Sequence, residues 1–289
     1  MNKTVIITGA TGTLGSRIMQ YHTEQGDTIY ALSRCDHKIA QWSKKYPDVR
    51  WCLGDIRNPL FGVLPQYAVD VVYHCAALKH VNMGESYPDQ YHEVNYKGTL
   101  NVFNHVSTDR FVFFSTDKAV LPVNFYGLCK AMAERHLISI KKASGCNIQV
   151  FRWGNIIGSQ GSVIHSFINQ LCNGSIIRVT HPEMTRFWLN IDDAVQFVTQ
   201  GEHDRAQDVL IHPKIKAASV IAVASAVAEC LCIPNYSIEY TGIRAGEKIH
   251  EHLKSDHDYC VRSDTADRYS HEELLALVGP TVSKYLAGE

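Results

Sequence analysis

The sequence lacks three features that would place it outside the ordinary globular proteins. It has no excess charge, since 28 Lys and Arg face 29 Asp and Glu among 289 residues, and such a chain offers no broad field for nucleic acid or an anionic membrane. No run approaches the ~20 apolar residues of a membrane helix. The apolar stretch near the N-terminus is too short for a secretory signal peptide. We therefore expect neither a nucleic-acid nor a membrane partner.

Paired cysteine motifs are also absent. Nine cysteines, an odd number, are scattered along the chain, and only Cys230 and Cys232 lie close together, as C-x-C rather than the C-x-x-C pairs of a zinc site. Cys52 and Cys75 lie in apolar runs, where a thiol packs as a small hydrophobic group. We expect reduced thiols and a cytoplasmic protein.

A repeated strand and helix pattern fills the first half of the sequence. Uncharged strands of this kind are typical of a parallel sheet that is covered on both faces by crossover helices. The sequence therefore predicts an α/β fold with a doubly wound parallel Rossmann sheet. The expected strands are residues 3–8, 28–34, 49–55, 69–76, 110–116 and 147–154, and the expected helices are residues 14–25, 37–46, 85–106 and 126–144.

The regular alternation of strand and helix ends near residue 158, and the later strands and helices follow no fixed order. We expect a Rossmann domain over residues 1–158, with a soft boundary and later returns to the sheet, and a smaller substrate-binding lobe with a C-terminal tail over residues 159–289. The later expected strands are residues 175–180, 208–212 and 236–240, and the later expected helices are residues 161–173, 192–201, 219–231 and 271–287.

A glycine-rich turn joins the first strand to the first helix. Its glycines follow G-x-x-G-x-x-G, so that no side chain blocks a pyrophosphate and the helix amides face it. Ordinary turns between strand and helix also use glycine, but this position in a Rossmann pattern favours dinucleotide binding. The expected cofactor contacts in this turn are Gly9, Thr11, Gly12, Thr13, Leu14 and Gly15.

The end of the second strand indicates which dinucleotide binds. An acid usually binds the ribose hydroxyls of NAD there, whereas this chain has Ser33 and Arg34, and a cation suits the 2′-phosphate of NADP. Alternatively, Arg34 is a surface residue and Asp36 takes the role of the acid. Asp55 and Ile56 follow the third strand and are expected to flank the adenine; Asp55 as a helix cap is the alternative.

The richest chemistry follows the strand at residues 110–116. Tyr126 and Lys130 are four residues apart, which places both on one helix face, so the ammonium can lower the pKa of the phenol and make it a base. Thr116, Asp117 and Lys118 come just before this helix. As an alternative, Asp117 and Lys118 form a solvated turn.

These residues resemble the extended short-chain dehydrogenase/reductases, and the segment STDKAVLPVNFYGLCKAMAER is similar to the inverting UDP-N-acetylglucosamine 4,6-dehydratases. The segments AALKHV, FRWGNIIGSQGSV, MTRFWLNIDDAVQF and RAGEKIHE match the family in the same order, so the resemblance covers most of residues 3–253. Three positions depart from the family pattern: Cys129, Trp153 and Gln160.

The resemblance implies a role for each matching residue. It implies that Lys118 removes the proton on carbon 5 of the sugar, that Asp117 protonates the leaving hydroxyl of carbon 6, and that Thr116 binds near the carbon 4 oxygen. Asn95 is expected to be structural. The cofactor contacts implied are Ala76, Ala77, Lys79, Tyr126 and Lys130, and the substrate contacts implied are His80, Asn155, Arg186, Arg244 and Glu247, the arginines on the diphosphate.

We therefore expect an NADP-dependent UDP-N-acetylglucosamine 4,6-dehydratase that acts on this or a close UDP-sugar and forms a homo-oligomer. A nucleotide-sugar 4-epimerase is the first alternative, because it needs Tyr126 and Lys130 but not the pair of Asp117 and Lys118. A non-catalytic NADP-binding sensor is the second. No metal is expected, since no acid or cysteine spacing completes a site around the H-x-H pair of His250 and His252.

Overall fold

The structure is a computed structural model, which describes residues 2–159, 161–201, 203–204, 206–255 and 260–288. The chain divides into two compact units. The first comprises Met1–Arg152 and Val195–Leu210, and the second comprises Trp153–Ala194 and Ile211–Glu289. The chain therefore leaves the first unit at the last residue of β6, returns to it within α8 and leaves it again within β10.

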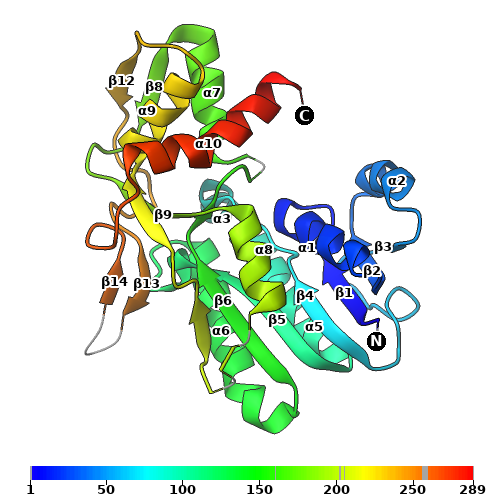
Figure 1. Ribbon diagram of the computed structural model, residues 1–289. Helices are drawn as coiled ribbons and strands as arrows, with labels where there is room; N and C mark the ends of the chain where they lie inside the picture. The colour runs from blue at the N-terminus through cyan, green and yellow to red at the C-terminus, as the bar shows by residue number, and fades with distance from the viewer. Residues whose placement is uncertain (1, 160, 202, 205, 256–259, 289) are drawn as a thin grey trace. The chain divides into compact units, whose positions relative to one another are not determined.

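The first unit is built on a seven-stranded sheet in the order β10-β6-β5-β4-β1-β2-β3 (Figure 1). The pairs β2–β3, β1–β2, β1–β4 and β4–β5 are parallel. This order, with crossovers to either side of β1, confirms the doubly wound Rossmann sheet. The strands are β1 (Thr4–Thr8), β2 (Thr28–Ser33), β3 (Arg50–Leu53), β4 (Val69–His74), β5 (Thr108–Thr116), β6 (Asn147–Trp153) and β10 (Val209–Ile211).

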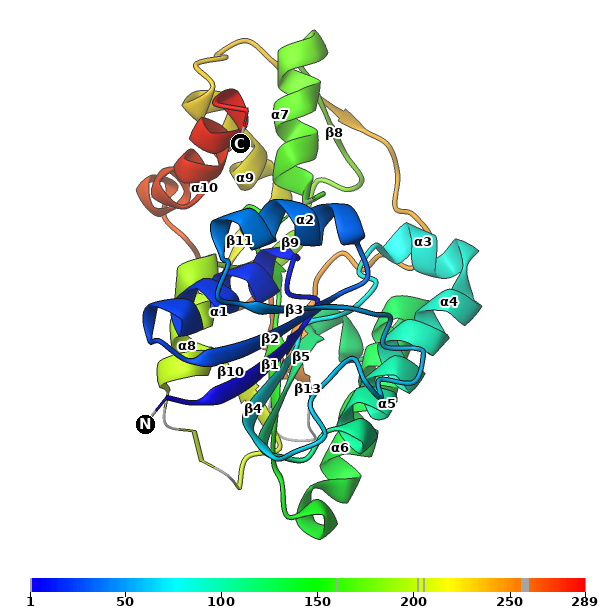
Figure 2. The ribbon, with the colours of Figure 1, turned by 90° about the vertical axis from the view of Figure 1, so that its right-hand side faces the viewer.

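Helices cover both faces of this sheet. Figure 2 shows α1 and α2 on one face and α5 and α6 on the other. Ile6, Val72 and Phe113 of the strands pack with Leu137 of α6 in one core, which explains why these strands carry almost no charge. The helices are α1 (Thr13–Glu24), α2 (Asp36–Lys45), α3 (Val81–Ser86), α4 (Pro88–His92), α5 (Gly98–His105), α6 (Phe125–Ser144) and α8 (Ile191–Gln200).

The helix expected over residues 85–106 is confirmed over residues 88–105 but is interrupted at Tyr87. The structure has α3, α4, a π-helical turn at Glu93–Lys97 and α5 over this stretch. Tyr87 takes φ −132° and ψ 58° because it precedes Pro88, whose ring disfavours helical geometry in the preceding residue. The wide π-helical turn lets Asn95 reach the loop after β4, as described below.

The second unit has its own core and several short sheets. Phe167 of α7 and Val223 of α9 pack with Val278 of α10 in one buried cluster. A three-stranded sheet has the order β11-β9-β7, and the pairs β12–β8 and β13–β14 stand apart from it. The elements are β7 (Asn155–Ile156), α7 (Val163–Gly174), β8 (Ile176–Val179), β9 (Thr185–Leu189), β11 (Lys216–Ser219), α9 (Val220–Cys230), β12 (Ser237–Tyr240), β13 (His252–Ser255), β14 (Cys260–Arg262) and α10 (His271–Leu286).

Candidate functional site

The glycine turn lies at the carboxyl end of β1, and its backbone could not accommodate larger residues. Gly9 has φ +66°, and a Cβ placed on it would lie 2.8 Å from the Cα of Ala76. A Cβ on Gly15, in the first turn of α1, would lie 2.4 Å from the Gly9 carbonyl oxygen. Gly12 is the N-cap of α1 and supplies no capping side chain. The turn thus presents backbone and the positive end of a helix, which fits a dinucleotide pyrophosphate.

The end of β2 lies against this turn. Thr11 Oγ1 and Ser33 Oγ, both buried, are hydrogen bonded at 2.9 Å. Arg34 and Asp36 are exposed. Asp36 begins α2, and its Oδ1 accepts a hydrogen bond from the backbone N–H of His37 at 2.7 Å. Ser33 therefore braces the turn, while Arg34 is the exposed cation that the sequence indicated at this strand end.

Asp55 is held by a single arginine. Its carboxylate accepts hydrogen bonds from the guanidinium of Arg57 at 2.7 and 3.0 Å and from the backbone N–H of Arg57. These bonds lower the pKa of Asp55, with a smaller contribution from the charge of Arg34. Residues 56 and 57 form a turn rather than a helix, so the helix-cap alternative is wrong. Ile56 is buried against Gly98.

The loop after β4 is bound to its neighbours through backbone groups. The N–H of Ala76 donates to Thr8 Oγ1 at 3.2 Å. The side-chain amide of Asn95 donates to the Leu78 carbonyl and accepts from the Leu78 N–H, both at 2.8 Å. Ala77, Lys79 and His80 of this loop are exposed. Asn95 therefore has the structural role that the sequence indicated.

Thr116, Asp117, Lys118 and Tyr126 form one cluster at the carboxyl end of β5. Thr116 Oγ1 donates to Asp117 Oδ1 at 2.9 Å, and Lys118 Nζ lies 2.9 Å from the same oxygen. Thr116, Asp117 and Lys118 all lie close enough to Tyr126 to shift the pKa of its phenol. The side chain of Asp117 is fully buried and that of Lys118 is 16% exposed. A solvated turn is therefore excluded, because a buried, paired acid and base lie beside the phenol.

The pKa of Tyr126 is raised to about 12 by burial, and Lys118 is the cation that opposes this shift. This differs from the expectation that Lys130 lowers the pKa of the phenol. Lys130 Nζ lies 3.9 Å from the ring centre of Phe113 instead, and burial lowers its own pKa to about 7. The four-residue spacing thus predicted a shared helix face but not the environment of each side chain.

Glu134 is a charged neighbour of Lys130 that the sequence analysis missed. It is 3% exposed, it raises the pKa of Lys130, and it pairs with Arg152 at 2.6 Å. Glu134 follows Lys130 by four residues on α6, and residues at this spacing are neighbours on a helix, so the sequence could have predicted their contact. Cys129, a departure from the family pattern, is buried beside Lys130, and burial raises the pKa of its thiol to about 11. Trp153 is also buried, and Gln160 lies outside the described residues.

Arg186 lies in the interior of the second unit rather than on its surface. The residue is 8% exposed, and its guanidinium donates to the backbone carbonyls of Thr185, Ile249 and Lys248 at 2.7 to 3.0 Å. It also lies 3.9 Å from the carboxylate of Glu251. The guanidinium therefore fastens residues 248–249 to β9.

Arg244 and Glu247 are joined by a small, partly exposed turn in the same unit. The Arg244 N–H donates to Glu247 Oε2 at 3.3 Å, and the Glu247 N–H donates to the Arg244 carbonyl at 3.1 Å. Arg244 is exposed, and Asn155 is partly buried in β7. Among the described residues, no group of three or more His, Cys, Asp and Glu side chains could hold a metal ion. His250 Nδ1 instead bonds Thr185 Oγ1 at 2.8 Å.

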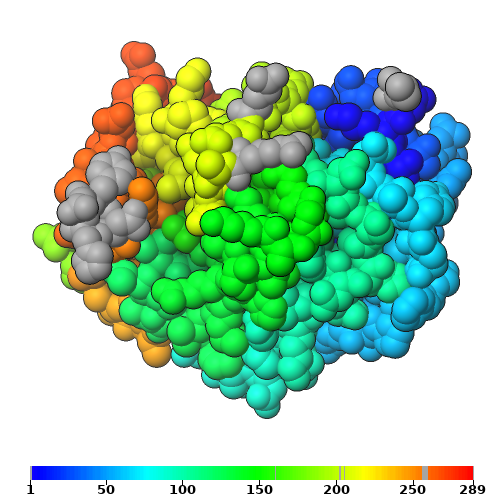
Figure 3. All heavy atoms as spheres, turned by 90° about the horizontal axis from the view of Figure 1, so that it is seen from below, coloured from blue at the N-terminus to red at the C-terminus, as the bar shows by residue number. Residues whose placement is uncertain are grey.

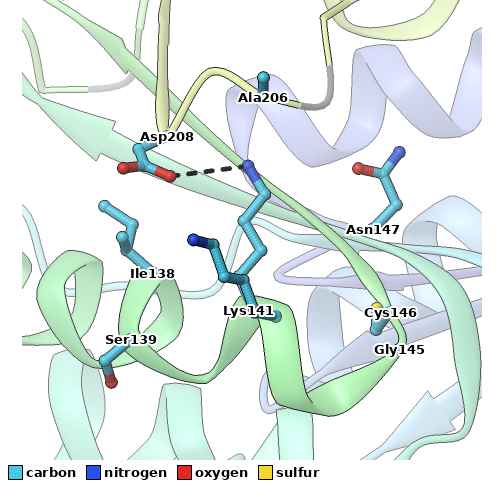
Figure 4. Close-up of a pocket in the computed structure, with 9 residues that line it drawn as sticks. Ile138, Ser139, Lys141, Gly145, Cys146, Asn147, Ala206 and Asp208 are labelled. Atoms are coloured by element: carbon cyan, nitrogen blue, oxygen red, sulfur yellow. Dashed lines mark ion pairs between the residues drawn. The ribbon is translucent and has the colours of Figure 1, made fainter.

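A surface hollow of about 700 Å³ lies at the other end of α6. Figure 4 shows Lys141 reaching across it, where Nζ lies 3.8 Å from Asp208 Oδ1 and donates to the Gln207 carbonyl at 2.7 Å. Figure 3 shows this end of the unit, with green atoms of α6 beside yellow-green atoms of the segment before β10. Fifteen residues of helix separate Tyr126 from Lys141, about 22 Å along the axis, so this hollow is not part of the cluster around Tyr126.

Comparison with known proteins identifies relatives of the whole chain. The family model described as "Polysaccharide biosynthesis protein" matches residues 5–273. A protein of Rickettsia canadensis named UDP-glucose 4-epimerase is 34% identical over 283 residues, which cover 93% of this chain and 82% of that protein. A protein of Campylobacter jejuni named UDP-N-acetylglucosamine 4,6-dehydratase (inverting) is 31% identical over 287 residues, which cover 96% and 84%.

Solved structures show the same architecture. The X-ray structure of Pen from Bacillus thuringiensis superposes with a TM-score of 0.88 at 28% identity and covers 97% of this chain and 98% of that chain. A UDP-glucuronic acid 4-epimerase from Bacillus cereus, solved with UDP-glucuronic acid and NAD, has a TM-score of 0.75 at 17% identity and covers 98% and 99%. This second likeness supports the fold alone. Among the helices of the described residues, none is long and apolar enough to span a membrane.

Proposed function

The chain belongs to the polysaccharide biosynthesis protein family, as an enzyme of the nucleotide-sugar dehydratase and epimerase group of short-chain dehydrogenase/reductases, and from this premise we propose that it is an inverting UDP-N-acetylglucosamine 4,6-dehydratase. The observation that carries the proposal is the buried pair of Asp117 and Lys118 beside Tyr126, at 2.9 Å. An epimerase that only oxidises and reduces carbon 4 has no use for this pair.

The ion pair supplies both proton transfers that elimination requires. Moving one proton from Lys118 to Asp117 gives a neutral amine and a carboxylic acid without changing the total charge. The amine then takes the proton from carbon 5, and the acid gives its proton to the hydroxyl leaving carbon 6, so that one water departs and the ion pair is restored. The distance of 2.9 Å between Lys118 Nζ and Asp117 Oδ1 allows this proton to pass directly between the two groups.

Tyr126 is assigned to accept the proton of the carbon 4 hydroxyl, and Thr116 is assigned to bind near the carbon 4 oxygen. The raised pKa of Tyr126 means that ligand binding has to lower it before the phenol can act as a base. Bound NADP would take the hydride from carbon 4 and supply it to carbon 6. A proton from solvent, added to carbon 5 on the face opposite to the one that lost its proton, would complete the inverted 4-keto product. Its proposed contacts in the first unit are Gly9, Thr11, Gly12, Thr13, Leu14, Gly15, Ser33, Arg34, Asp55, Ile56, Ala76, Ala77, Lys79, Tyr126 and Lys130.

The second unit is assigned to the nucleotide-sugar. By family resemblance the substrate contacts are Asn155, Arg244 and Glu247, with His80 of the first unit. Arg244 is the exposed guanidinium suited to a diphosphate. Arg186 is also proposed as a diphosphate contact, but its bonds to three backbone carbonyls favour a role in holding the segment that follows Arg244. We place the enzyme in the cytoplasm as a homo-oligomer.

The product distinguishes this function from the second candidate, a 4-epimerase, which the names of several relatives favour. The experiment incubates the protein with UDP-N-acetylglucosamine and measures the nucleotide-sugar by mass spectrometry. Loss of one water supports the dehydratase, an isomer of unchanged mass supports the epimerase, and unaltered substrate supports a non-catalytic sensor. UDP-glucose is run in parallel, since an epimerase of that sugar would act on it.

The preference for NADP is tested at Arg34. An exposed guanidinium at the end of β2 is expected to favour the 2′-phosphate by at least ~10-fold in dissociation constant, about 1.4 kcal/mol. Titration calorimetry with NADP and NAD should show this difference in the parent protein and its loss in Arg34→Ala, with NAD affinity little changed. Equal affinities in the parent, or no change in Arg34→Ala, would contradict the preference for NADP.

A further inference from the structure

His74 is a buried titratable residue that the proposed reaction does not use. It is the last residue of β4, it is 1% exposed, and its ring lies nearly parallel to those of Phe111 and Phe113 on the neighbouring strand. Both ring nitrogens have hydrogen-bond partners: Nδ1 lies 2.9 Å from Thr8 Oγ1, and Nε2 lies 3.0 Å from Thr99 Oγ1. A polar ring so deeply placed has to be fixed by these partners.

The bonds made by the two threonines determine which nitrogen carries the proton. Thr99 Oγ1 donates to the Asn95 carbonyl at 2.9 Å, so its only hydrogen is used and it accepts from Nε2–H of His74. Thr8 Oγ1 accepts from the Ala76 N–H at 3.2 Å, which leaves its own hydrogen for Nδ1. His74 is therefore neutral and protonated on Nε2. Burial, with a smaller effect of Lys130, agrees with this by lowering its pKa to about 3.

The same hydrogen bonds hold two segments that face the cofactor site. Thr8 is followed directly by Gly9 of the glycine turn, and its carbonyl accepts from the Cys75 N–H at 3.1 Å. On the other side of the ring, His74 bonds Thr99, and Thr99 bonds the backbone carbonyl of Asn95. The side-chain amide of Asn95 in turn hydrogen bonds to both the N–H and the carbonyl of Leu78. Gly9 and Ala76 are packed so closely that a Cβ on Gly9 would lie 2.8 Å from Ala76. A shift of either segment would therefore displace the other.

We propose that His74 is a positioning residue for dinucleotide binding, which as the neutral Nε2–H tautomer sets the loop of residues 76–80 against the glycine turn. The inference rests on the proposed cofactor site. His74 touches no reacting atom; it acts through Thr8 and Thr99. Replacing it should therefore weaken binding of the dinucleotide and spare binding of UDP, whose diphosphate is assigned to Arg244 of the second unit.

The binding experiment uses the full chain with Thr99→Val and His74→Asn. Thr99→Val keeps the shape of the side chain and removes the acceptor of Nε2–H, and Thr99→Ser restores the hydroxyl as the rescue. We expect the dissociation constant for NADP to rise by at least ~10-fold in Thr99→Val and His74→Asn, with Thr99→Ser near the parent and UDP affinity unchanged throughout. His22→Asn is the matched control, because His22 is also buried but bonds Asp27 near the end of α1.

A spectroscopic measurement tests the tautomer without any ligand. Nitrogen-15 correlation spectra of the histidine rings should show His74 as the Nε2–H form from pH 8 to pH 5, and Thr99→Val should change its ring shifts. The other tautomer, or a protonated ring, overturns the inference. So does unchanged NADP affinity in both variants of a parent that binds it. A parent that binds neither NADP nor NAD overturns the proposed cofactor site together with this inference.

Discussion

Lys130 is a cation placed where charge is disfavoured. It is 3% exposed, and burial lowers its pKa to about 7 from the ordinary 10.5 despite the opposing effect of Glu134. In the unfolded chain this amine keeps its proton up to pH 10.5, so the folded protein holds fewer protons between about pH 7 and pH 10. Stability is therefore expected to rise with pH across this window, and Lys130 costs stability below it.

The first prediction follows from this cost. Lys130→Met should raise the free energy of unfolding of the ligand-free protein by about 1 kcal/mol at pH 7, because Glu134 keeps Arg152 as its partner. The gain should shrink between pH 7 and pH 9.5, and enzyme activity should be lost. Urea unfolding of the parent and the variant at both pH values measures this difference in the free energy of unfolding. Lys97→Met, at an exposed pair with Glu93, is the control and should change stability by less than ~0.5 kcal/mol. A less stable Lys130→Met protein would contradict the prediction.

The second prediction separates the roles of Tyr126 and Asp117. Tyr126→Phe should stop the reaction before hydride leaves carbon 4, so no absorbance of reduced dinucleotide appears when UDP-N-acetylglucosamine is added. Asp117→Asn should still permit oxidation of carbon 4, so reduced dinucleotide accumulates while water loss falls by roughly 10²- to 10⁴-fold. Rapid-mixing absorbance and mass spectrometry of the product follow the two steps.

Isotope incorporation provides the control for this separation. In deuterated water the parent enzyme should place deuterium on carbon 5 of the product, because the proton removed there is replaced from solvent. Lys118→Ala should slow this incorporation together with water loss. If Asp117→Asn and Lys118→Ala both lose water at parental rates, the assignment of the pair fails and the epimerase becomes the better candidate.

At the scale of elements, the start of α6 is packed against the turn that carries the ion pair. Asn124 caps the helix by accepting from the Gly127 N–H at 2.7 Å. A Cβ on Gly127 would lie 2.1 Å from the backbone oxygen of Lys118, closer than any real contact. The absence of a side chain at residue 127 therefore lets one helix position both Tyr126 and the turn of Asp117 and Lys118.

The third prediction tests this close approach. Gly127→Ala should lower the rate of water loss by at least ~10-fold and destabilise the protein by about 1–3 kcal/mol, because backbone has to move. Activity is measured by product formation and stability by urea unfolding. Gly174→Ala is the matched control, since nothing lies within 4 Å of a Cβ there, and alanine at the end of α7 should be neutral or slightly stabilising. Equal behaviour of the two variants would refute the packing argument.

The elements that the sequence predicted well were those with strong local patterns. The strands of the Rossmann sheet are mainly apolar runs with few charged residues, and they alternate with helices. Thr116, Asp117 and Lys118 form a cluster because they are adjacent in the chain. Strands β9 and β11 were not predicted, because TRFWL is buried at every position and shows no alternation, while KAAS has no β-branched residue. Arg186 lies within β9, so its burial could not be read from the sequence.

At the scale of the whole molecule, the chain's path was harder to predict than its parts. The segment Val195–Leu210 rejoins the first unit after the excursion into the second. Arg110 of β5 donates to the Val198 carbonyl at 2.7 Å, and Phe151 of β6 packs edge-on against Phe197. These contacts join residues that are 88 and 46 positions apart, and no local pattern in the sequence specifies such pairings.

The last prediction concerns assembly of the whole molecule. Leu128 and Met132 are 44% and 43% exposed on α6, one helical turn apart, so they form an apolar stripe that is costly to leave in water. We expect this stripe to pack against its copy across a two-fold axis.

Light scattering at micromolar concentration should give a mass of at least twice 32.4 kDa, and the double variant Leu128→Glu with Met132→Glu should have a lower mass. Leu286→Glu, at an exposed leucine that ends α10, should leave the mass unchanged. A monomeric parent, or a double variant of parental mass, would exclude this face as the interface.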